Sequence, residues 1–366
     1  MRANYKAPGK RVIVKPAPEK KKRSPWKTAG MILYAILVAI STVIVGVYLY
    51  FTFFVKPPEV APQPDPAPPV VEQPGEDEPD TPLPDEPVEP GAEPLERREG
   101  VYTFLLAGAD AGGYRTDTMM VLSYDTKAQT VGVVSVPRDT LTRRSGGENP
   151  KLVYGKGGVE QRVQDISNML GIPIDYYVKI NLKAFVSVID YLGGVDFYVP
   201  CDMNYDDPYQ DLHIHFKEGM QHLNGQQVME VARFRQNNKD ENGNVTGYWD
   251  TGRTQTQQKL LIALAKKLLS WNSLTKVNGF VEIFNKYVKT DMELSDMLWF
   301  ASQAIYVDTG NGVQTATLTG DGDVRYNGVS YCFQLDEQAT LDTVNALLNP
   351  YTRDMTVEDM NLFIVK

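Results

Sequence analysis

The chain has 366 residues and a formal net charge of −9, and its charge is distributed very unevenly. Residues 1–27 hold ten Lys and Arg against one Glu, whereas residues 56–99 hold three against thirteen acidic residues. Residues 29–55 contain no charged residue. This distribution excludes a freely soluble enzyme that is globular from end to end, and it divides the chain into four regions.

The uncharged segment at 29–55 is predicted to be a transmembrane helix. Its 27 residues would measure roughly 40 Å, which is enough to cross a hydrocarbon core of about 30 Å with some tilt. A cleaved signal peptide is the alternative, but its apolar core normally has about 7–15 residues and ends at small residues. This segment continues to Phe51, Phe53 and Phe54, so we expect an uncleaved signal anchor.

The basic residues precede the predicted span and the acidic residues follow it. The positive-inside rule therefore places residues 1–28 in the cytoplasm as a basic tail and everything after Lys56 outside. Blocks of Lys and Arg also bind nucleic acid, but four prolines interrupt any recognition helix in the tail, and contact with anionic lipid headgroups is the favoured interpretation. We expect a single-pass cell-membrane protein with an extracytoplasmic main domain and no nucleic-acid partner.

Residues 56–99 are predicted to form a disordered linker. They hold 14 of the 24 prolines and almost no aromatic or aliphatic clusters, so they bury too little apolar surface to offset the entropy of ordering. In the extended polyproline II conformation, at about 3.1 Å per residue, the linker would reach on the order of 130 Å. A tether into the cell wall and a simple spacer are both compatible with this composition.

Residues 100–366 have the composition of one globular α/β domain. Short apolar runs predict strands at 103–107, 119–124 and 131–136, and residues 125–129 predict a hairpin between the last two, so this part of the sheet is expected to be antiparallel. Helical patterns occur at 159–170, 182–192, 225–231, 253–271, 274–288, 295–306 and 337–348. The mixture predicts a mixed central β-sheet flanked by helices.

Two aspartates stand at the two ends of one predicted loop. Asp110 follows the first strand and Asp117 precedes the second, so their carboxylates can lie close together. Mg²⁺ is typically held by one or two carboxylates together with waters and substrate phosphates, which makes the pair a candidate metal-diphosphate site. Each aspartate also suits the cap of a turn, and the spacing alone favours that structural interpretation.

Several arginines stand where predicted elements begin or end. Arg138 and Asp139 follow the third strand, and Arg233 and Arg235 are two residues apart, a spacing that puts both on one face of a strand but not of a helix. Arg253 begins a predicted helix, where the helix dipole disfavours a cation unless an anion is present. Arginine suits bidentate phosphate contacts, and ion pairs with the many carboxylates are an equally good explanation.

Two other polar groups have metal-binding and structural interpretations. His213 and His215 alternate along a predicted strand and suit a metal ion, but the sequence shows no third ligand. Asp202, Asp206 and Asp207 suit Ca²⁺, but they lack regular loop spacing and are expected to hydrate a turn. The structural interpretation is favoured for both groups.

The two cysteines, Cys201 and Cys332, fall in the domain that is expected to lie outside the cytoplasm. That compartment permits a disulfide bond. The sequence gives no distance between the two thiols, so it leaves their pairing open.

The order of motifs in the main domain resembles that of the LytR-CpsA-Psr family. The resemblance covers essentially all of 100–366 and is strongest over 102–270, and the single N-terminal anchor agrees with it. It rests on these segments: Phe104–Asp110, Arg115-Thr116-Asp117-Thr118, Val133–Asp139, Leu192–Asp196, Leu223-Asn224-Gly225, Arg233-Phe234-Arg235, and Asp250–Arg253 with Gln257-Gln258. Several motifs in a fixed order make the resemblance specific.

The resemblance implies an extracytoplasmic phosphotransferase in an envelope of the Gram-positive type. Such an enzyme moves a glycopolymer, of the teichoic acid or capsular or wall polysaccharide type, from a polyprenyl-diphosphate carrier to peptidoglycan. The implied partners are this lipid-linked polymer, peptidoglycan and membrane lipid, and the implied cofactor is Mg²⁺, with Mn²⁺ as an alternative. The polyprenyl tail would lie in an apolar groove between sheet and helices.

The same resemblance assigns roles to individual residues. The implied metal ligands are Asp110 and Asp117, the implied diphosphate ligands are Arg115, Arg138, Arg233, Arg235 and Arg253, and the implied orienting residues are Asp139 and Asp250. Phosphoryl transfer spreads charge over phosphate oxygens, so clustered cations are what this chemistry needs. The catalytic candidates are Asp117, Arg138 and Asp139, and the base that takes the acceptor's proton is Asp117 or a metal-bound water.

The sequence departs from the family pattern at two places. Thr256 stands where many relatives carry a further Arg, and residues 151–158 look shorter than the usual segment, which leaves Lys151 a weak candidate. Neither departure removes an implied metal ligand. Both leave the preference for polymer and acceptor open.

Two other function classes stay open at this stage. A hydrolase that cleaves the lipid diphosphate would use the same site, with water in place of the sugar hydroxyl. A non-catalytic envelope regulator or glycan-binding module would bind without turnover.

Overall fold

The computed structural model describes residues 56–62, 94–109, 116–143, 148–154, 157–247, 249–268, 286 and 288–365. The predicted basic tail and transmembrane segment, at 1–28 and 29–55, lie outside the described residues. Within the described ranges, no helix is both long enough and apolar enough to span a bilayer. Chain contacts define one compact unit from Pro57 to Lys366.

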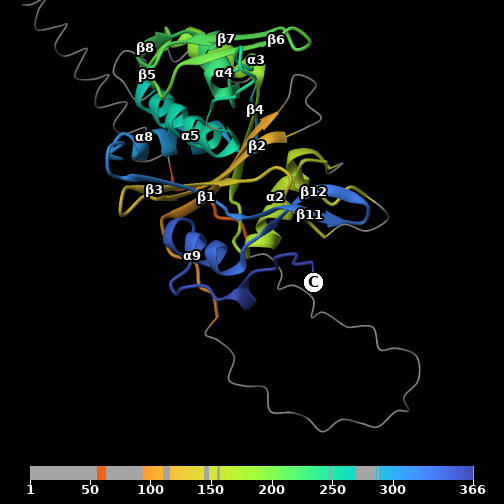
Figure 1. Cartoon of the computed structure of the whole chain (residues 1–366). Helices are drawn as coiled ribbons and strands as arrows, with labels where there is room; N and C mark the ends of the chain where they lie inside the picture. The colour runs from red at the N-terminus through yellow and green to blue at the C-terminus, as the bar shows by residue number, and fades with distance from the viewer. Residues whose placement is uncertain are drawn as a thin grey trace, which may run out of the picture. The chain divides into compact units, whose positions relative to one another are not determined.

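A six-stranded mixed sheet forms the centre of this unit (Figure 1). Its strands are β1 (Val101–Ala109), β2 (Thr116–Asp125), β3 (Thr130–Val136), β4 (Tyr176–Asn181), β9 (Val288–Thr290) and β10 (Val313–Thr317). They lie in the order β10-β3-β2-β1-β4-β9. The pairs β1–β2, β2–β3 and β4–β9 are antiparallel, whereas β1–β4 and β3–β10 are parallel. The predicted antiparallel hairpin is therefore confirmed within a mixed sheet.

Most predicted helices are confirmed to within a few residues at their ends. The described helices are α2 (Gly158–Leu170), α3 (Leu182–Tyr191), α4 (Gly225–Arg233), α5 (Trp249–Leu268), α8 (Leu294–Ala304) and α9 (Glu337–Leu347), with 3-10 helices at Leu152–Tyr154 and Val357–Asp359. The predicted helix at 274–288 lies mostly outside the described residues. Its last residue was assigned wrongly, because Val288 begins strand β9.

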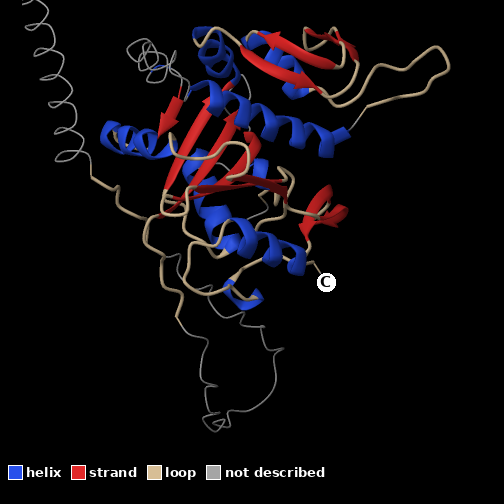
Figure 2. Cartoon of the chain, turned by 90° about the vertical axis from the view of Figure 1, so that its left-hand side faces the viewer, coloured by secondary structure: helices blue, strands red, loops and turns tan. Residues whose placement is uncertain are grey.

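Alternation along the strands gives the sheet two apolar faces. On β1, Leu105 and Ala107 belong to the cluster that packs with α2 and α9. Tyr102 and Phe104, at the alternate positions, contact the ring of Phe300 in α8 with centroids 5.0 and 4.9 Å apart. Helices therefore cover both faces, as Figure 2 shows, and the predicted sheet flanked by helices is confirmed.

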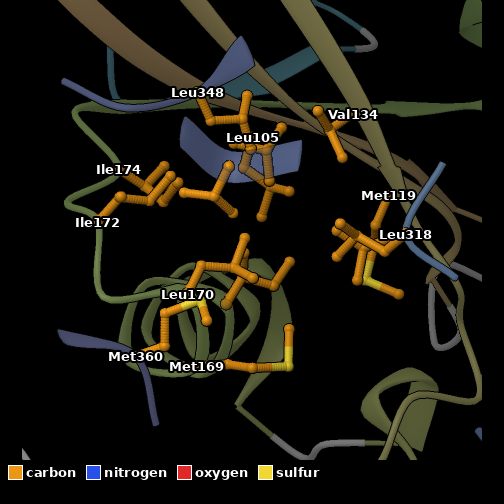
Figure 3. Close-up of a cluster of buried hydrophobic side chains, with 14 of the residues drawn as sticks. Leu105, Met119, Val134, Met169, Leu170, Ile172, Ile174, Leu318, Leu348 and Met360 are labelled. Carbon is orange, nitrogen blue, oxygen red and sulfur yellow. The ribbon is translucent and has the colours of Figure 1, made fainter. Parts of the chain in front are cut away.

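The largest cluster of buried side chains lies between the sheet and helices α2 and α9 (Figure 3). Leu105, Val134 and Leu170 in it are fully buried, and each such side chain contributes about 1.5–3 kcal/mol relative to exposure. Gly132 of β3 has a steric reason to be glycine, because a Cβ atom there would lie 1.9 Å from the carbonyl oxygen of Leu347. The C-terminal end of α9 can therefore pack this closely on β3 only because residue 132 is a glycine.

A second apolar cluster lies beneath two small antiparallel ribbons. The ribbons are β5 (Val195–Val199) with β8 (Gly219–Leu223), and β6 (Met203–Asp207) with β7 (Leu212–Phe216). In β5 and β7, buried residues alternate with exposed ones, and the buried ones pack with residues of α3, α4 and α5. Figure 1 shows these elements together at the top of the view. A further ribbon pairs β11 (Gly320–Tyr326) with β12 (Val329–Leu335).

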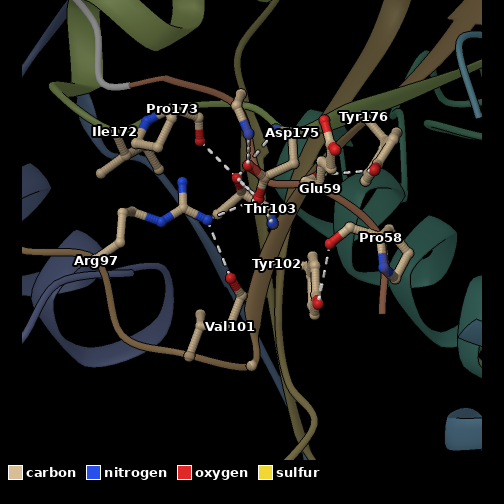
Figure 4. Close-up of polar contacts among 12 residues, drawn as sticks. Pro58, Glu59, Arg97, Val101, Tyr102, Thr103, Ile172, Pro173, Asp175 and Tyr176 are labelled. Atoms are coloured by element: carbon tan, nitrogen blue, oxygen red, sulfur yellow. Dashed lines mark hydrogen bonds and ion pairs between the residues drawn. The ribbon is translucent and has the colours of Figure 1, made fainter. Parts of the chain in front are cut away.

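A buried carboxylate joins the described ends of the predicted linker to the sheet (Figure 4). Asp175, just before β4, accepts hydrogen bonds from the amide and hydroxyl of Thr103 at 2.7 and 2.9 Å, from Arg97 Nη2 at 2.8 Å and from the amide of Ala61 at 2.7 Å. Residues on both sides of 63–93 are therefore part of the folded unit. Residues 63–93 themselves lie outside the described residues.

Candidate active site

The directions of the strands bring the ends of three strands together at one edge of the central sheet. β1 and β3 end at this edge and β2 begins there. In the register of β2 and β3, Met119 lies opposite Val136. Asp117 is two residues before the first of these and Arg138 two residues after the second, so continuing the register places Asp117 beside Arg138 although they are far apart in the sequence.

Four charged side chains form a continuous series of ion pairs here, and we call them the sheet-edge cluster: Asp117, Arg138, Asp139 and Lys151. Arg138 Nη1 lies 2.7 Å from Asp117 Oδ1, and Arg138 Nε lies 3.4 Å from Asp139 Oδ2. Lys151 Nζ lies 3.3 Å from Asp139 Oδ1. The side chains of Asp117, Arg138 and Asp139 are 41%, 30% and 34% exposed, so a ligand can reach them from solvent.

Backbone hydrogen bonds from two other segments hold the loop that carries Arg138. The amide of Val153 donates to the carbonyl of Arg138 at 2.9 Å, and the amide of Phe333 in β12 donates to the carbonyl of Asp139 at 2.9 Å. The loop is therefore fixed on both sides by elements distant in the sequence. This support limits the reorganisation needed when a ligand binds, which favours electrostatic stabilisation.

The electrostatic environment keeps Arg138 charged. Burial lowers the pKa of the guanidinium, but the hydrogen bond to Asp117 and the charges of Asp139 and Asp117 outweigh it, so the pKa of Arg138 is raised above its ordinary value. The group is therefore a permanent cation at any physiological pH. Two carboxylates at present neutralise it, and an incoming phosphate would compete with them for its hydrogen bonds.

Two glutamines fix helix α5 against the sheet and against α4. Gln258 Nε2 donates to Ser135 Oγ in β3 at 3.0 Å and to the carbonyl of Ala316 in β10 at 2.7 Å. Gln257 Nε2 donates to the carbonyl of Ala232, near the end of α4, at 3.0 Å. The middle of α5 is thus tied both to the strand that leads into Arg138 and to the helix that ends at Arg233.

The prediction that Arg253 begins its helix is wrong. The helix begins four residues earlier, at Trp249, so Arg253 lies one turn inside α5 and is partly buried. The dipole argument for an anion beside Arg253 therefore loses its basis. Asp250 occupies the first turn instead, where the dipole favours a negative charge, and its side chain is outside the described residues.

The strand interpretation of the two neighbouring arginines is also wrong. Arg233 is the last residue of α4, and Phe234 forms its C-cap, so Arg233 and Arg235 lie on either side of a helix end. Arg233 Nη2 donates to Gln210 Oε1, in the turn between β6 and β7, at 2.7 Å. The described contacts therefore do not bring Arg233 to the sheet-edge cluster.

Two predicted site residues, Asp110 and Arg115, lie outside the described residues, so their roles stay predictions. Asp110 directly follows Ala109, and Ala109 pairs with Thr116 beside Asp117. The carboxylates at these two positions are oxygen donors of the kind that Mg²⁺ prefers, and Asp117 is partly exposed. Because both residues offer carboxylate oxygens, Asp110 and Asp117 suit a hard divalent cation such as Mg²⁺.

Lys151 belongs to the sheet-edge cluster, although the sequence pattern made it only a weak candidate for the site. Its side chain pairs with Asp139 and is only 12% exposed, and its backbone forms an isolated β-bridge with Leu141. A signal was present, because a lysine just before an apolar run can reach back over a neighbouring loop. Without knowledge of the register, nothing showed which loop it would meet.

A cleft of about 530 Å³ lies on another side of the first turns of α5. Its lining residues are Pro200, Cys201, Asp202, Asn237, Thr246, Gly247, Gly252, Gln255, Thr256 and Lys259. It contains none of the predicted arginines, although Gly252 adjoins Arg253. Cys201 and Cys332 are free thiols in different parts of the fold, so the structure forms no disulfide between them.

A mixed sheet between helices, with a charged cluster at the edge where β1 and β3 end, defines an α/β protein. The sequence profile of the LytR_cpsA_psr family matches residues 73–349, which is more than half of the chain. The chain belongs to this family.

Particular relatives support the assignment to the family. The chain is 33% identical over 251 residues to a polyisoprenyl-teichoic acid–peptidoglycan teichoic acid transferase, TagU, of Bacillus anthracis, covering 67% of this chain and 77% of the relative. It is 32% identical over 233 residues to TagV of Bacillus subtilis, covering 62% and 56%. The crystal structure of B. subtilis TagV matches with a TM-score of 0.57 and 28% identity, covering 70% of this chain and all of that one.

Proposed function

We propose that the chain is a membrane-anchored, extracytoplasmic phosphotransferase that moves a teichoic acid type of glycopolymer from a polyprenyl-diphosphate carrier to peptidoglycan. The observation that carries this proposal is the sheet-edge cluster. Arg138 and Lys151 lie there beside Asp117 and Asp139, and backbone hydrogen bonds fix the loop that carries Arg138 and Asp139. The similar proteins TagU and TagV are named as transferases of teichoic acid to peptidoglycan, which supports this proposal.

The reaction that we propose exchanges one phosphorus–oxygen bond for another. The acceptor hydroxyl oxygen of peptidoglycan bonds to the phosphorus that carries the polymer, and the bond to the bridging oxygen of the diphosphate breaks. The bridging oxygen keeps the electron pair and leaves as polyprenyl monophosphate. The hydroxyl proton passes to a carboxylate of the cluster, and Asp117 is the first candidate because its side chain is the most exposed.

The arginines hold the diphosphate and stabilise its developing charge in this proposal. Arg138 has the strongest support, since its backbone is fixed and its charge is secured. Arg115, Arg235 and Arg253 are assigned as further ligands from the family resemblance. Arg233 would first have to give up its hydrogen bond with Gln210.

We assign Mg²⁺, or alternatively Mn²⁺, to Asp110 and Asp117. When bound, such an ion would supply positive charge to the diphosphate oxygens. Asp117 also holds Arg138 in place through their ion pair. Asp139, paired with both Arg138 and Lys151, orients the two cations.

The membrane location is also part of the proposal. Residues 29–55 carry no charge and follow a basic tail, which supports a single-pass anchor with the folded unit on the outer side. The lipid carrier and the growing wall would then both be within reach of the same enzyme.

The experiment uses the full-length chain, purified in detergent and given a polyprenyl-diphosphate-linked teichoic acid precursor with and without peptidoglycan. We expect covalent coupling of the polymer to peptidoglycan only when the acceptor is present. Release of polymer phosphate at the same rate without acceptor would indicate a hydrolase instead. Binding of the lipid without any turnover would contradict both enzymatic functions and favour a glycan-binding or regulatory module.

A further inference from the structure

A second polar cluster lies on the ribbon of β6 and β7. In the antiparallel register, Asp206 lies opposite His213 and Asn204 lies opposite His215. All four residues are on the exposed side of the ribbon, because they alternate with residues such as the buried Ile214. The neighbouring strand thus supplies the third group that the sequence did not reveal beside the two histidines.

The side chains of this cluster are close enough together to share one ion. Asp206 Oδ1 lies 2.5 Å from His213 Nδ1 and 3.2 Å from His215 Nε2. One ligand atom from each of the three residues lies within 4.8 Å of the other two. Two imidazoles and one carboxylate are a ligand set that binds Zn²⁺ while leaving a fourth position open.

The second nitrogen of each ring also faces an oxygen acceptor. His215 Nδ1 lies 2.8 Å from Asn204 Oδ1, and His213 Nε2 lies 3.7 Å from Asp211 Oδ1. Metal-binding histidines commonly donate their other N–H group to such an acceptor, which fixes the tautomer and the orientation of the ring. The hydrogen bond to Asn204 holds the His215 ring with Nε2 directed toward Asp206, whereas the 3.7 Å contact of His213 with Asp211 is too long for a hydrogen bond.

The two other aspartates considered for Ca²⁺ are engaged elsewhere. Asp202 pairs with Lys217 at 2.8 Å and accepts the amide of Glu218. Asp207 caps the turn by accepting the amides of Tyr209 and Gln210. The expected turn role is confirmed for Asp207, whereas Asp202 contacts residues 217 and 218, so these two aspartates do not join Asp206 in a Ca²⁺ set. Asp206 instead joins imidazoles, which suit Zn²⁺, Cu²⁺ or Ni²⁺ rather than Ca²⁺.

We propose that Asp206, His213 and His215 form a binding site for a divalent transition-metal ion, with Zn²⁺ as the occupant. The bound ion joins strands β6 and β7 and keeps an open coordination position toward solvent. The site is independent of the proposed transferase reaction, because none of its ligands belongs to the sheet-edge cluster.

The test is a calorimetric titration of ZnCl₂ into the full-length chain in detergent. We expect one ion to bind per chain, and we expect His213→Ala and His215→Ala each to weaken binding by at least about 100-fold. Asn204→Ala removes only the partner of a ligand, and loss of such outer partners typically costs about 10–100-fold, so a decrease of about tenfold is expected. All of these side chains are exposed, so the variants should keep the fold, which circular dichroism checks.

The remaining histidine provides a matched control. His222 Nδ1 lies 2.7 Å from Asp196 Oδ1 and is as exposed as the other two, but the metal-binding group found among the described residues does not include it. His222→Ala should therefore keep full Zn²⁺ affinity. Bound Cu²⁺ should give an electron paramagnetic resonance spectrum with hyperfine coupling to two imidazole nitrogens, reduced to one in either ligand variant. Uptake that is absent, or equal in the wild-type chain and both ligand variants, would overturn the proposal.

Discussion

Two arginine–aspartate pairs of nearly equal length lie at opposite ends of the central sheet. Arg97 and Asp175 are 2.8 Å apart near the start of β1, and Arg138 and Asp117 are 2.7 Å apart at the edge where β1 ends. The side chain of Asp175 is 0% exposed, whereas that of Asp117 is 41% exposed. Distance alone therefore does not distinguish a pair that holds the fold together from one that is available to bind a ligand.

The difference lies in the other partners of each carboxylate. Asp175 accepts from a hydroxyl, two amides and a guanidinium, so its charge is compensated within the protein (Figure 4). Asp117 and Arg138 are accessible to solvent, and a phosphate can replace the carboxylate as a partner of the guanidinium. The buried pair serves stability, and the partly exposed pair on a fixed loop is the one available to the proposed ligand.

The largest effect should follow from loss of the buried carboxylate. Asp175→Ala leaves the Arg97 guanidinium largely buried without its charge partner and removes the acceptor for Thr103, and breaking such a pair typically costs about 3–5 kcal/mol. We expect a decrease of this size in the free energy of unfolding, measured with urea. Asp125→Ala is the control, because Asp125 pairs with the more exposed Arg98 at 3.4 Å and its other partners are the amides of Lys127 and Ala128 in an exposed turn, so its loss should cost about 1 kcal/mol or less. Equal losses in the two variants would mean that burial does not separate these pairs.

The next largest effect concerns turnover. Arg138→Ala should lower the rate of polymer transfer by about 10²–10³-fold, as is typical when one preorganised donor is removed from a transition state. Its free energy of unfolding should change by only about 1 kcal/mol, since the pair is partly exposed. Arg325→Ala, on the exposed side of β11, should leave both quantities unchanged. Wild-type turnover in Arg138→Ala would remove Arg138 from the site.

A smaller effect is expected on the metal requirement. Asp117→Asn removes the proposed proton acceptor, which lowers the maximal rate, and also a charged ligand of the proposed Mg²⁺, so the Mg²⁺ concentration that gives half of the variant's own maximal rate should rise by at least about tenfold. Asp125→Asn changes the same kind of residue at the opposite end of the same strand and should leave the Mg²⁺ titration unchanged. A titration curve that is identical in the wild-type chain and Asp117→Asn would place the ion elsewhere.

The sequence predicted the fold better than it predicted the contacts of the site. Apolar periodicity and turn residues located the first three strands, the hairpin and most helices, because these patterns are local. The pairing of Asp117 with Arg138 depends on the register of β2 and β3, which no local pattern specifies. The sequence pattern predicts that α5 begins at Arg253, yet the helix begins at Trp249 and its first turn includes Asp250-Thr251-Gly252.

The two histidines illustrate the same limit. Their alternation showed that they share a face of a strand, but the third ligand, Asp206, comes from the neighbouring strand and became visible only with the register of β6 and β7. Lys151 was undervalued for a related reason, since its partner Asp139 lies on a different loop. Chemistry between elements far apart in the sequence requires the sheet topology, whereas chemistry within one element does not.

The smallest expected effect concerns a third pair of intermediate burial. Arg353 contacts Asp359 through two hydrogen bonds of 2.8 and 3.1 Å, with side chains 21% and 16% exposed. Burial raises the pKa of the Asp359 carboxyl, but the hydrogen bonds from Arg353 and Thr356 outweigh it and the pKa is lowered. The pair therefore stabilises the fold above the unfolded pKa of about 4, and this stabilisation is lost as the pH falls through the lower folded pKa.

Asp359→Asn tests this grading of the three pairs. Near neutral pH the variant should unfold with a free energy about 1 kcal/mol below that of the wild-type chain, between the expected values for Asp125→Ala and Asp175→Ala. In urea titrations at decreasing pH, the difference should shrink below about pH 4, because protonation of Asp359 in the wild-type chain removes the same charge. A difference that stays constant down to the acid limit would show that Asp359 acts through its backbone and packing, and burial would then not rank these pairs.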